Sequence, residues 1–313
     1  MHSQVICIMN KSLRYFVLAC LLLTAASCVF MDNQSTPQGY VRHCVRLLDR
    51  QALYADTPEW QEKKKEVLSK AKALADMDGA HTLVGEAAGV AGGKHSSIVP
   101  PVKDTASYPE IAPEAKMMDG NIAYVLLPAH MGVKVSDSLY SHTVLDFLES
   151  HADAAGVVVD LRDNRGGNMY PMIAAVSPLL PDGVLMRFKG RKRTSPVYLN
   201  FVLSSERISK VQKFPEDVPV AILTDDWTGS SGEAVLLCFR GLPNVRTFGI
   251  PTAGYASANI PYGLADGYRL VVTTSCDMAR TGEVFCDDPI EPDVYAEDAL
   301  EAALGWLREP EKL

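Results

Sequence analysis

The chain has 313 residues, of which 47% are hydrophobic and 22% charged, and its formal net charge is -8. This length and composition predict one large globular domain or two smaller ones and exclude a disordered chain. The acidic balance argues against nucleic acid as a partner, because phosphate binding needs a basic surface. One dense basic cluster, residues 189–193, is interpreted as a solvated turn.

The N-terminus has the pattern of a secretory signal. Lys11 and Arg14 precede the apolar run 15–23, and small residues then lead to Cys28. A basic segment, a short apolar segment and small residues are typical of such signals. The cysteine resembles that of a bacterial lipobox, so we expect lipidation of Cys28 and anchoring to a membrane of the cell envelope. Cleavage without a lipid and an uncleaved anchor are the alternatives.

Export places the cysteines in an oxidising compartment. Cys276 and Cys286 flank a turn, and they either form a disulfide across a hairpin or remain two half-buried thiols. No spacing of cysteine and histidine resembles a zinc site, so we expect neither a metal nor a cofactor.

Two helices are predicted after the signal. Apolar residues at helical spacing predict a helix over 40–55, and Thr57-Pro58 predicts the start of a second helix that ends near residue 75. Glycines and small residues argue against a regular element over 85–93, and prolines between 100 and 113 predict an extended linker. With a signal at 1–28, residues 29–115 are therefore expected to form a small helical cap that carries the linker.

The pattern then changes to alternating strands and helices, which define a predicted core domain at 116–313. Nearly continuous apolar strands between helices predict an α/β domain with both faces of its sheet covered. Strands are predicted at 122–127, 157–161, 218–223, 245–249 and 268–273, and helices at 137–152, 170–180, 231–239 and 296–307.

Thr228 to Glu233 forms a polar turn between a predicted strand and a predicted helix. A serine at this position, Ser230, lies beside unpaired N–H groups at the helix N-terminus, which is what a nucleophile with an oxyanion hole requires. The alternative is structural, because Ser-x-x-Glu is also the capping-box pattern.

Two other glycine-rich segments carry candidate functional residues. Gly166 and Gly167 follow the strand at 157–161, where paired glycines permit close approach of the backbone and leave N–H groups free. A simple β-turn is the alternative for that segment. Residues 92–97 contain His95, which is either a polar surface residue or a general base.

In this order the segments resemble the C-terminal processing (tail-specific) peptidase superfamily. The resemblance covers about 85–293, and the segment around His95 is most similar to the Ser-His branch that contains the nisin-resistance protein. The spacing between His95 and Asn121 leaves no room for the PDZ module that tail-specific proteases usually carry. The matching motifs are Asp160 to Gly167, Thr228 to Glu233, Gly249 to Gly254, and Pro292-Asp293.

The resemblance implies a ClpP/crotonase-like spiral core beneath the helical cap and a serine peptidase site. It places the nucleophile at Ser230 and the two oxyanion-hole donors at Ser231 and at either Gly166 or Gly167. The lysine that tail-specific proteases use is absent after Gly254, so His95 is the expected base.

No acidic residue is predicted to orient His95, because Asp287 and Asp288 fit better as part of the turn before Pro289. Without a PDZ module, a peptide is expected to bind between the cap and the core as an extended strand. Ser257 and Asn259 are candidates for lining that groove, with a role in a turn as the alternative.

These observations predict an exported serine endopeptidase that cleaves peptides or unstructured protein tails through an acyl-enzyme. The alternative is a non-catalytic peptide-binding or immunity lipoprotein on the same fold, which the missing acidic partner of His95 favours. An acyl-CoA enzyme of the crotonase type would share the fold, but CoA thioesters are cytoplasmic and the chain is predicted to be exported.

Overall fold

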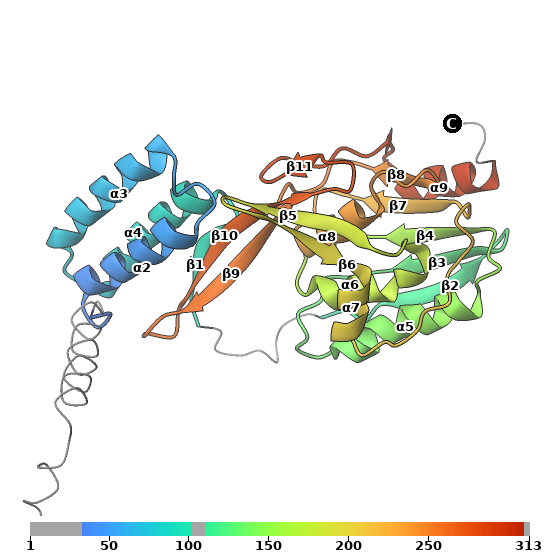
Figure 1. Cartoon of the computed structure of the whole chain (residues 1–313), viewed down its shortest axis with the longest axis horizontal. Coiled ribbons are helices and arrows are strands. Elements are labelled where there is room, and N and C mark those ends of the chain that lie inside the picture. Colours follow the sequence, from blue (N-terminus) through green and yellow to red (C-terminus); the bar gives the residue numbers. More distant parts are fainter. Residues whose placement is uncertain (1–32, 102–109, 310–313) are drawn as a thin grey trace, which may run out of the picture.

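The computed structural model describes residues 33–101 and 110–309. The predicted signal at 1–28 and the lipidation site Cys28 lie outside the described residues. Within the described ranges, no helix has the length and hydropathy needed to cross a membrane. A small helical lobe, the cap, and a larger α/β lobe, the core, are joined by a long antiparallel ribbon of strands (Figure 1).

The cap consists of three helices, α2 (Pro37–Gln51), α3 (Pro58–Lys70) and α4 (Met77–Gly92). Each helix begins at a residue whose side chain accepts a hydrogen bond from the first turn, as helix N-termini require. These residues are Thr36, Thr57 and Asp76. The first two helices confirm the sequence prediction.

The prediction of an irregular segment at 85–93 was wrong, because α4 continues to Gly92. Its small side chains, among them Val84, Ala87, Ala88 and Ala91, are fully buried in the apolar cluster that α4 shares with α2. Burial of this face outweighs the low helix propensity of the glycines.

The cap is packed directly onto the ribbon. Strand β1 (Ser97–Val99) pairs antiparallel with β10 (Arg269–Met278). Leu270 and Val272 of β10 belong to the apolar cluster of the cap, and the Leu53 N–H donates to the Thr273 carbonyl at 2.9 Å. The segment that carries His95 is therefore held between a cap helix and a strand of the ribbon.

The core is built on a six-stranded sheet in the order β12-β8-β7-β4-β3-β2. All neighbouring strands are parallel except β2 and β3, which are antiparallel. The strands are β2 (Glu114–Met118), β3 (Ile122–Leu126), β4 (Gly156–Asp160), β7 (Val220–Thr224), β8 (Val245–Gly249) and β12 (Val294–Tyr295).

Both faces of this sheet are covered by helices. Helices α5 (Asp137–Ser150), α6 (Met169–Ala175) and α8 (Ser231–Phe239) contribute to the apolar cluster on one face, together with alternate residues such as Val157 and Val159. The residue between them, Val158, packs with α9 (Ala299–Arg308) on the other face. The predicted α/β class, with a helical N-terminal region, is confirmed.

The second sheet was mostly missed by the sequence analysis. Its strands β5 (Val184–Gly190), β6 (Thr194–Tyr198), β9 (Ser257–Gly263) and β11 (Val284–Phe285) are antiparallel to their neighbours, and α7 (Leu199–Ser205) follows β6. Only β10 was predicted, in part.

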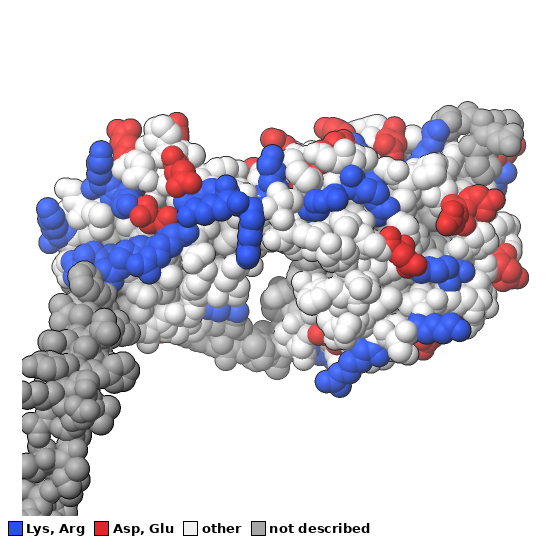
Figure 2. All heavy atoms as spheres, in the orientation of Figure 1, with Lys and Arg blue, Asp and Glu red and all other residues white. Residues whose placement is uncertain are grey.

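Basic side chains gather on the visible face of the cap, with acidic ones among them (Figure 2).

A disulfide joins Cys276 at the end of β10 to Cys286, just after β11. It decides between the two alternatives left open by the sequence. The cross-link ties the segment that contains Asp287 and Asp288 to the ribbon, and this segment contacts the loop of His95. A Cβ atom at Gly93 would lie 2.4 Å from the Asp287 carboxylate, so this side chain lies directly against the backbone of the loop.

We predict that replacing both Cys276 and Cys286 with serine lowers the free energy of unfolding by about 2–3 kcal/mol, because a loop of this length is no longer closed in the unfolded chain. Urea unfolding in the absence of a reductant, with the wild-type disulfide intact, measures the change. Dithiothreitol should destabilise the wild type equally and leave the double variant unaffected. An unchanged midpoint in both experiments would contradict the prediction.

Candidate active site

Ser230 lies between β7 and α8 in a strained backbone conformation. Its φ is 54° and its ψ is -115°, outside the extended region that helix-capping residues normally occupy. A residue other than glycine at such angles costs about 1–3 kcal/mol, and such strain persists only where surrounding contacts enforce it. Contacts with neighbouring residues therefore hold Ser230 in this conformation at the N-terminus of α8.

The contact that enforces the turn comes from Glu233, which is fully buried. One carboxylate oxygen accepts the N–H groups of Ser230 and Tyr255, both at 2.8 Å. The other accepts the Thr252 hydroxyl and the Gly254 N–H. Burial raises the pKa of Glu233 above its usual value, while these four donors oppose the rise.

The Gly166-Gly167 loop lies against the Ser230 turn. A Cβ atom at Gly166 would be 2.8 Å from the Ser230 Cβ and 3.0 Å from the Ser231 nitrogen, so only glycine fits there. The Ser231 hydroxyl donates to the Gly167 carbonyl at 2.6 Å. Buried Asn164 joins the two loops, because its carbonyl accepts the Gly229 N–H at 2.9 Å.

His95 reaches the same region from the cap side. Its Nδ1 lies 2.9 Å from the Ser257 hydroxyl, and its ring packs edge-on against Tyr255 with centroids 5.1 Å apart. The Lys94 ammonium group lies over the Tyr255 ring, 4.5 Å from its centroid, and donates to the Ala253 carbonyl. Burial, and next the charge of Lys94, lower the pKa of His95 to about 4.

A cavity of about 380 Å³ brings the two candidate residues together. The indole of Trp227, 53% exposed, lines this cavity, with the Arg165 guanidinium 4.0 Å from the ring centroid. The lining residues are His95, Arg165, Asp226, Trp227, Gly229, Ser230, Ala253 and Tyr255.

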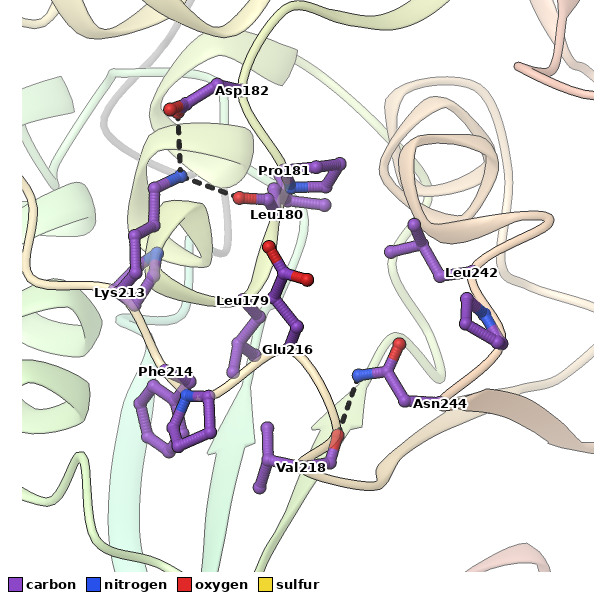
Figure 3. A pocket seen from close by; sticks show the side chains of 13 residues that line it. Leu179, Leu180, Pro181, Asp182, Lys213, Phe214, Glu216, Val218, Leu242 and Asn244 are labelled. Carbon is purple, nitrogen blue, oxygen red and sulfur yellow. Dashed lines mark hydrogen bonds and ion pairs between the residues drawn. The ribbon is translucent and has the colours of Figure 1, made fainter.

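A second cavity, of about 390 Å³, lies elsewhere on the core and shares no residue with the first. Figure 3 shows it beside Lys213, whose ammonium group donates to the Leu180 carbonyl and pairs with Asp182 at 3.3 Å. None of its lining residues carries a hydroxyl, thiol or imidazole group. It offers neither a hydroxyl or thiol nucleophile nor an imidazole base, whereas the cavity at Ser230 has a serine and a histidine, so the cavity at Ser230 is the candidate active site.

Ser257 and Asn259 both contact the segment of His95. Ser257 is 6% exposed and faces the imidazole, and the Asn259 amide donates to the His95 carbonyl at 3.5 Å. Neither is among the residues that line the cavity. A direct contact of either with substrate stays a prediction.

Sequence reasoning missed the supporting contacts of the site. Glu233 was noticed only as part of a capping-box pattern, and this pattern is present, with the Glu233 carboxylate accepting the Ser230 N–H. Ser257 as the partner of the imidazole was not predicted, because no local signal connects it to His95. Among the described residues, no cluster of His, Cys, Asp or Glu is arranged to hold a metal ion.

The model of peptidase family S41 matches residues 121–296, which include the Ser230 turn and the glycine loop. The chain belongs to this family. The S41 match does not include His95, which lies in the cap.

Relatives extend the S41 similarity across the cap. The nisin-resistance protein of Lactococcus lactis subsp. lactis is 36% identical over 284 residues, covering 87% of each chain. The solved structure of a lipoprotein from Streptococcus agalactiae is 30% identical with a TM-score of 0.78, covering 87% of this chain and 96% of the other. The photosystem II D1 C-terminal processing protease, 12% identical, shares the fold with a TM-score of 0.60, over 83% and 93% of the two chains.

We predict that Glu233→Gln lowers the free energy of unfolding by about 1–3 kcal/mol, although glutamine has the same shape. All four contacts of Glu233 are donors to its oxygens, and an amide NH₂ would face at least one of them. Urea unfolding measures the loss. Glu283→Gln, which weakens the half-exposed pair with Arg240, is the matched control and should cost less than about 1 kcal/mol.

Proposed function

We propose that this member of a peptidase family is an exported serine endopeptidase with Ser230 as nucleophile and His95 as general base. The observation that carries the proposal is the shared cavity, which is lined both by a strained serine at a helix N-terminus and by a half-buried imidazole. No other lining residue is a serine, cysteine, threonine or histidine.

Ser257 gives the imidazole a defined role. When its hydroxyl accepts the proton of His95 Nδ1, the Nε2 atom carries the free lone pair. That atom takes the proton of Ser230 as its oxygen attacks the peptide carbonyl, and it returns the proton to the leaving amine as the C–N bond breaks. Water then attacks the acyl-enzyme and gives a proton to His95, and the ester bond to Ser230 breaks as the serine oxygen regains a proton from His95.

The developing oxyanion needs two N–H donors. Ser231 supplies one, because it is the first residue of α8 and its N–H has no acceptor within the helix. For the second donor the N–H of Gly166 is already committed to the Asn164 side chain at 3.0 Å. We therefore assign the second donor to Gly167.

The family supports a peptide or protein substrate, and the relatives support a location in the cell envelope. We propose a peptide or an unstructured protein tail as substrate and a lipid anchor at Cys28. The name of the Lactococcus relative makes nisin a suitable first substrate to test. The second candidate, a non-catalytic peptide-binding or immunity lipoprotein, is favoured by one observation: the partner of His95 Nδ1 is a hydroxyl and not a carboxylate.

A fluorophosphonate probe distinguishes the two candidate functions. We expect it to label the wild type, and to fail on Ser230→Ala, which also lowers peptide cleavage about 10⁴-fold or more. His95→Ala should lose both signals as well, because the serine is no longer activated. Ser204→Ala, at an exposed position of α7, is a matched control and should behave as wild type. Undiminished cleavage by the Ser230 variant would refute the peptidase assignment.

The pH dependence follows from the environment of His95. The base works only when neutral, so activity falls as the pH drops below its pKa, which burial and then Lys94 lower to about 4. We expect the acidic limb of kcat/KM near this pH, and Lys94→Met should move it upward. Lys116→Met removes a similar cation over Tyr124, away from the site, and should leave the limb unchanged. A limb that ignores Lys94 would contradict this account.

A further inference from the structure

A buried histidine outside the candidate dyad lies directly behind the glycine loop. His130 is fully buried, and its main chain holds the loop on both sides. Its N–H donates to the Gly166 carbonyl at 3.0 Å, and its carbonyl accepts the Asn168 N–H at 2.7 Å. A Cβ atom at Gly167 would lie 1.9 Å from the His130 carbonyl oxygen, so the two backbones are in direct contact.

The His130 ring lies between two carboxylates. Nε2 lies 2.7 Å from Asp137 at the start of α5, and Nδ1 lies 3.3 Å from Glu110. Tyr140 packs on the ring with centroids 4.4 Å apart, and its hydroxyl donates to the Pro128 carbonyl. Nε2 is therefore hydrogen-bonded to Asp137, Nδ1 faces the Glu110 carboxylate without a hydrogen bond to any described residue, and Tyr140 packs on one face of the ring.

Glu110 is itself held rigidly. Its side chain is 1% exposed, and its carboxylate accepts the N–H groups of five consecutive residues, Met131 to Val135. Burial alone would raise the pKa of Glu110, but these hydrogen bonds outweigh it and lower the pKa to about 2. The loop after His130 is thus wrapped around a fixed negative charge.

Asp137 also contacts the residue that follows the two glycines. Its second oxygen accepts the side-chain amide of Asn168 at 3.3 Å. The carboxylate therefore connects the His130 ring to the residue that follows Gly167. Glu206 is a further acidic group whose charge interacts with both Asp137 and His130.

We propose that His130 is a positioning residue for the oxyanion hole. Its ring, hydrogen-bonded to Asp137 and lying beside the Glu110 carboxylate, fixes the backbone that positions Gly166 and Gly167 beside Ser230. No contact of the ring with substrate is involved. The inference rests on the proposed peptidase function for its kinetic consequence, but the clamping of the loop is a property of the folded chain.

The test is His130→Phe, which keeps a ring against Tyr140 and removes both nitrogens. Glu110 retains its five N–H donors and the half-exposed Asp137 can hydrate, so the variant should fold. We expect kcat to fall about 10- to 100-fold with KM within about twofold, since misplacement of an oxyanion donor acts on the transition state. Amide hydrogen exchange at residues 166–168 should become faster.

Asp137→Asn provides a second variant, with a smaller loss of kcat in the same direction, should the phenylalanine variant not fold. His142→Gln removes the exposed His-Asp pair within α5 and is the matched control, with kcat and exchange unchanged. Wild-type kcat and unaltered exchange in a folded His130 or Asp137 variant would overturn the inference. If the wild type itself neither cleaves peptides nor labels, the proposed function fails, while the exchange measurement still decides whether His130 clamps the loop.

Discussion

The carboxylate of Glu233 is the interaction on which the rest of the candidate site depends. It collects donors from the Ser230 turn and from the segment that contains Thr252, Gly254 and Tyr255. The N–H of Tyr255 is bonded here while its ring touches His95, so one buried group links the supports of both proposed catalytic residues. A neutral side chain could not satisfy four donors at once, which explains why an expensive buried acid occupies this position.

Residue identities at the candidate site could be predicted from sequence, but their supports could not. Ser230, Gly166 and His95 lie in short glycine-punctuated motifs, whose local chemistry and order along the chain point to a peptidase family. The bond of Ser257 to the imidazole joins residues far apart in the chain, and it exists only because β1 pairs with β10 and β10 with β9. No periodicity in the sequence encodes such a register.

The fold shows the same division. Strands such as β4 and β7, buried on both faces, appear in the sequence as continuous apolar runs and were predicted. Strands β5, β6 and β9 are only partly buried, so their mixed composition gave no comparable signal. Helix α4 was missed for another reason: its stability comes from packing small side chains against α2, a tertiary effect that outweighs the propensity of its glycines.

The placement of His95 on the cap side of the ribbon has a consequence for biosynthesis. The imidazole belongs to a segment made early, whereas the strand β10 and Ser257 that hold it are made after the nucleophile turn. On the proposed mechanism, a nascent or truncated polypeptide possesses the Ser230 hydroxyl without an aligned proton acceptor. It would gain the ability to cut only after β10 and Ser257 have folded against the segment of His95.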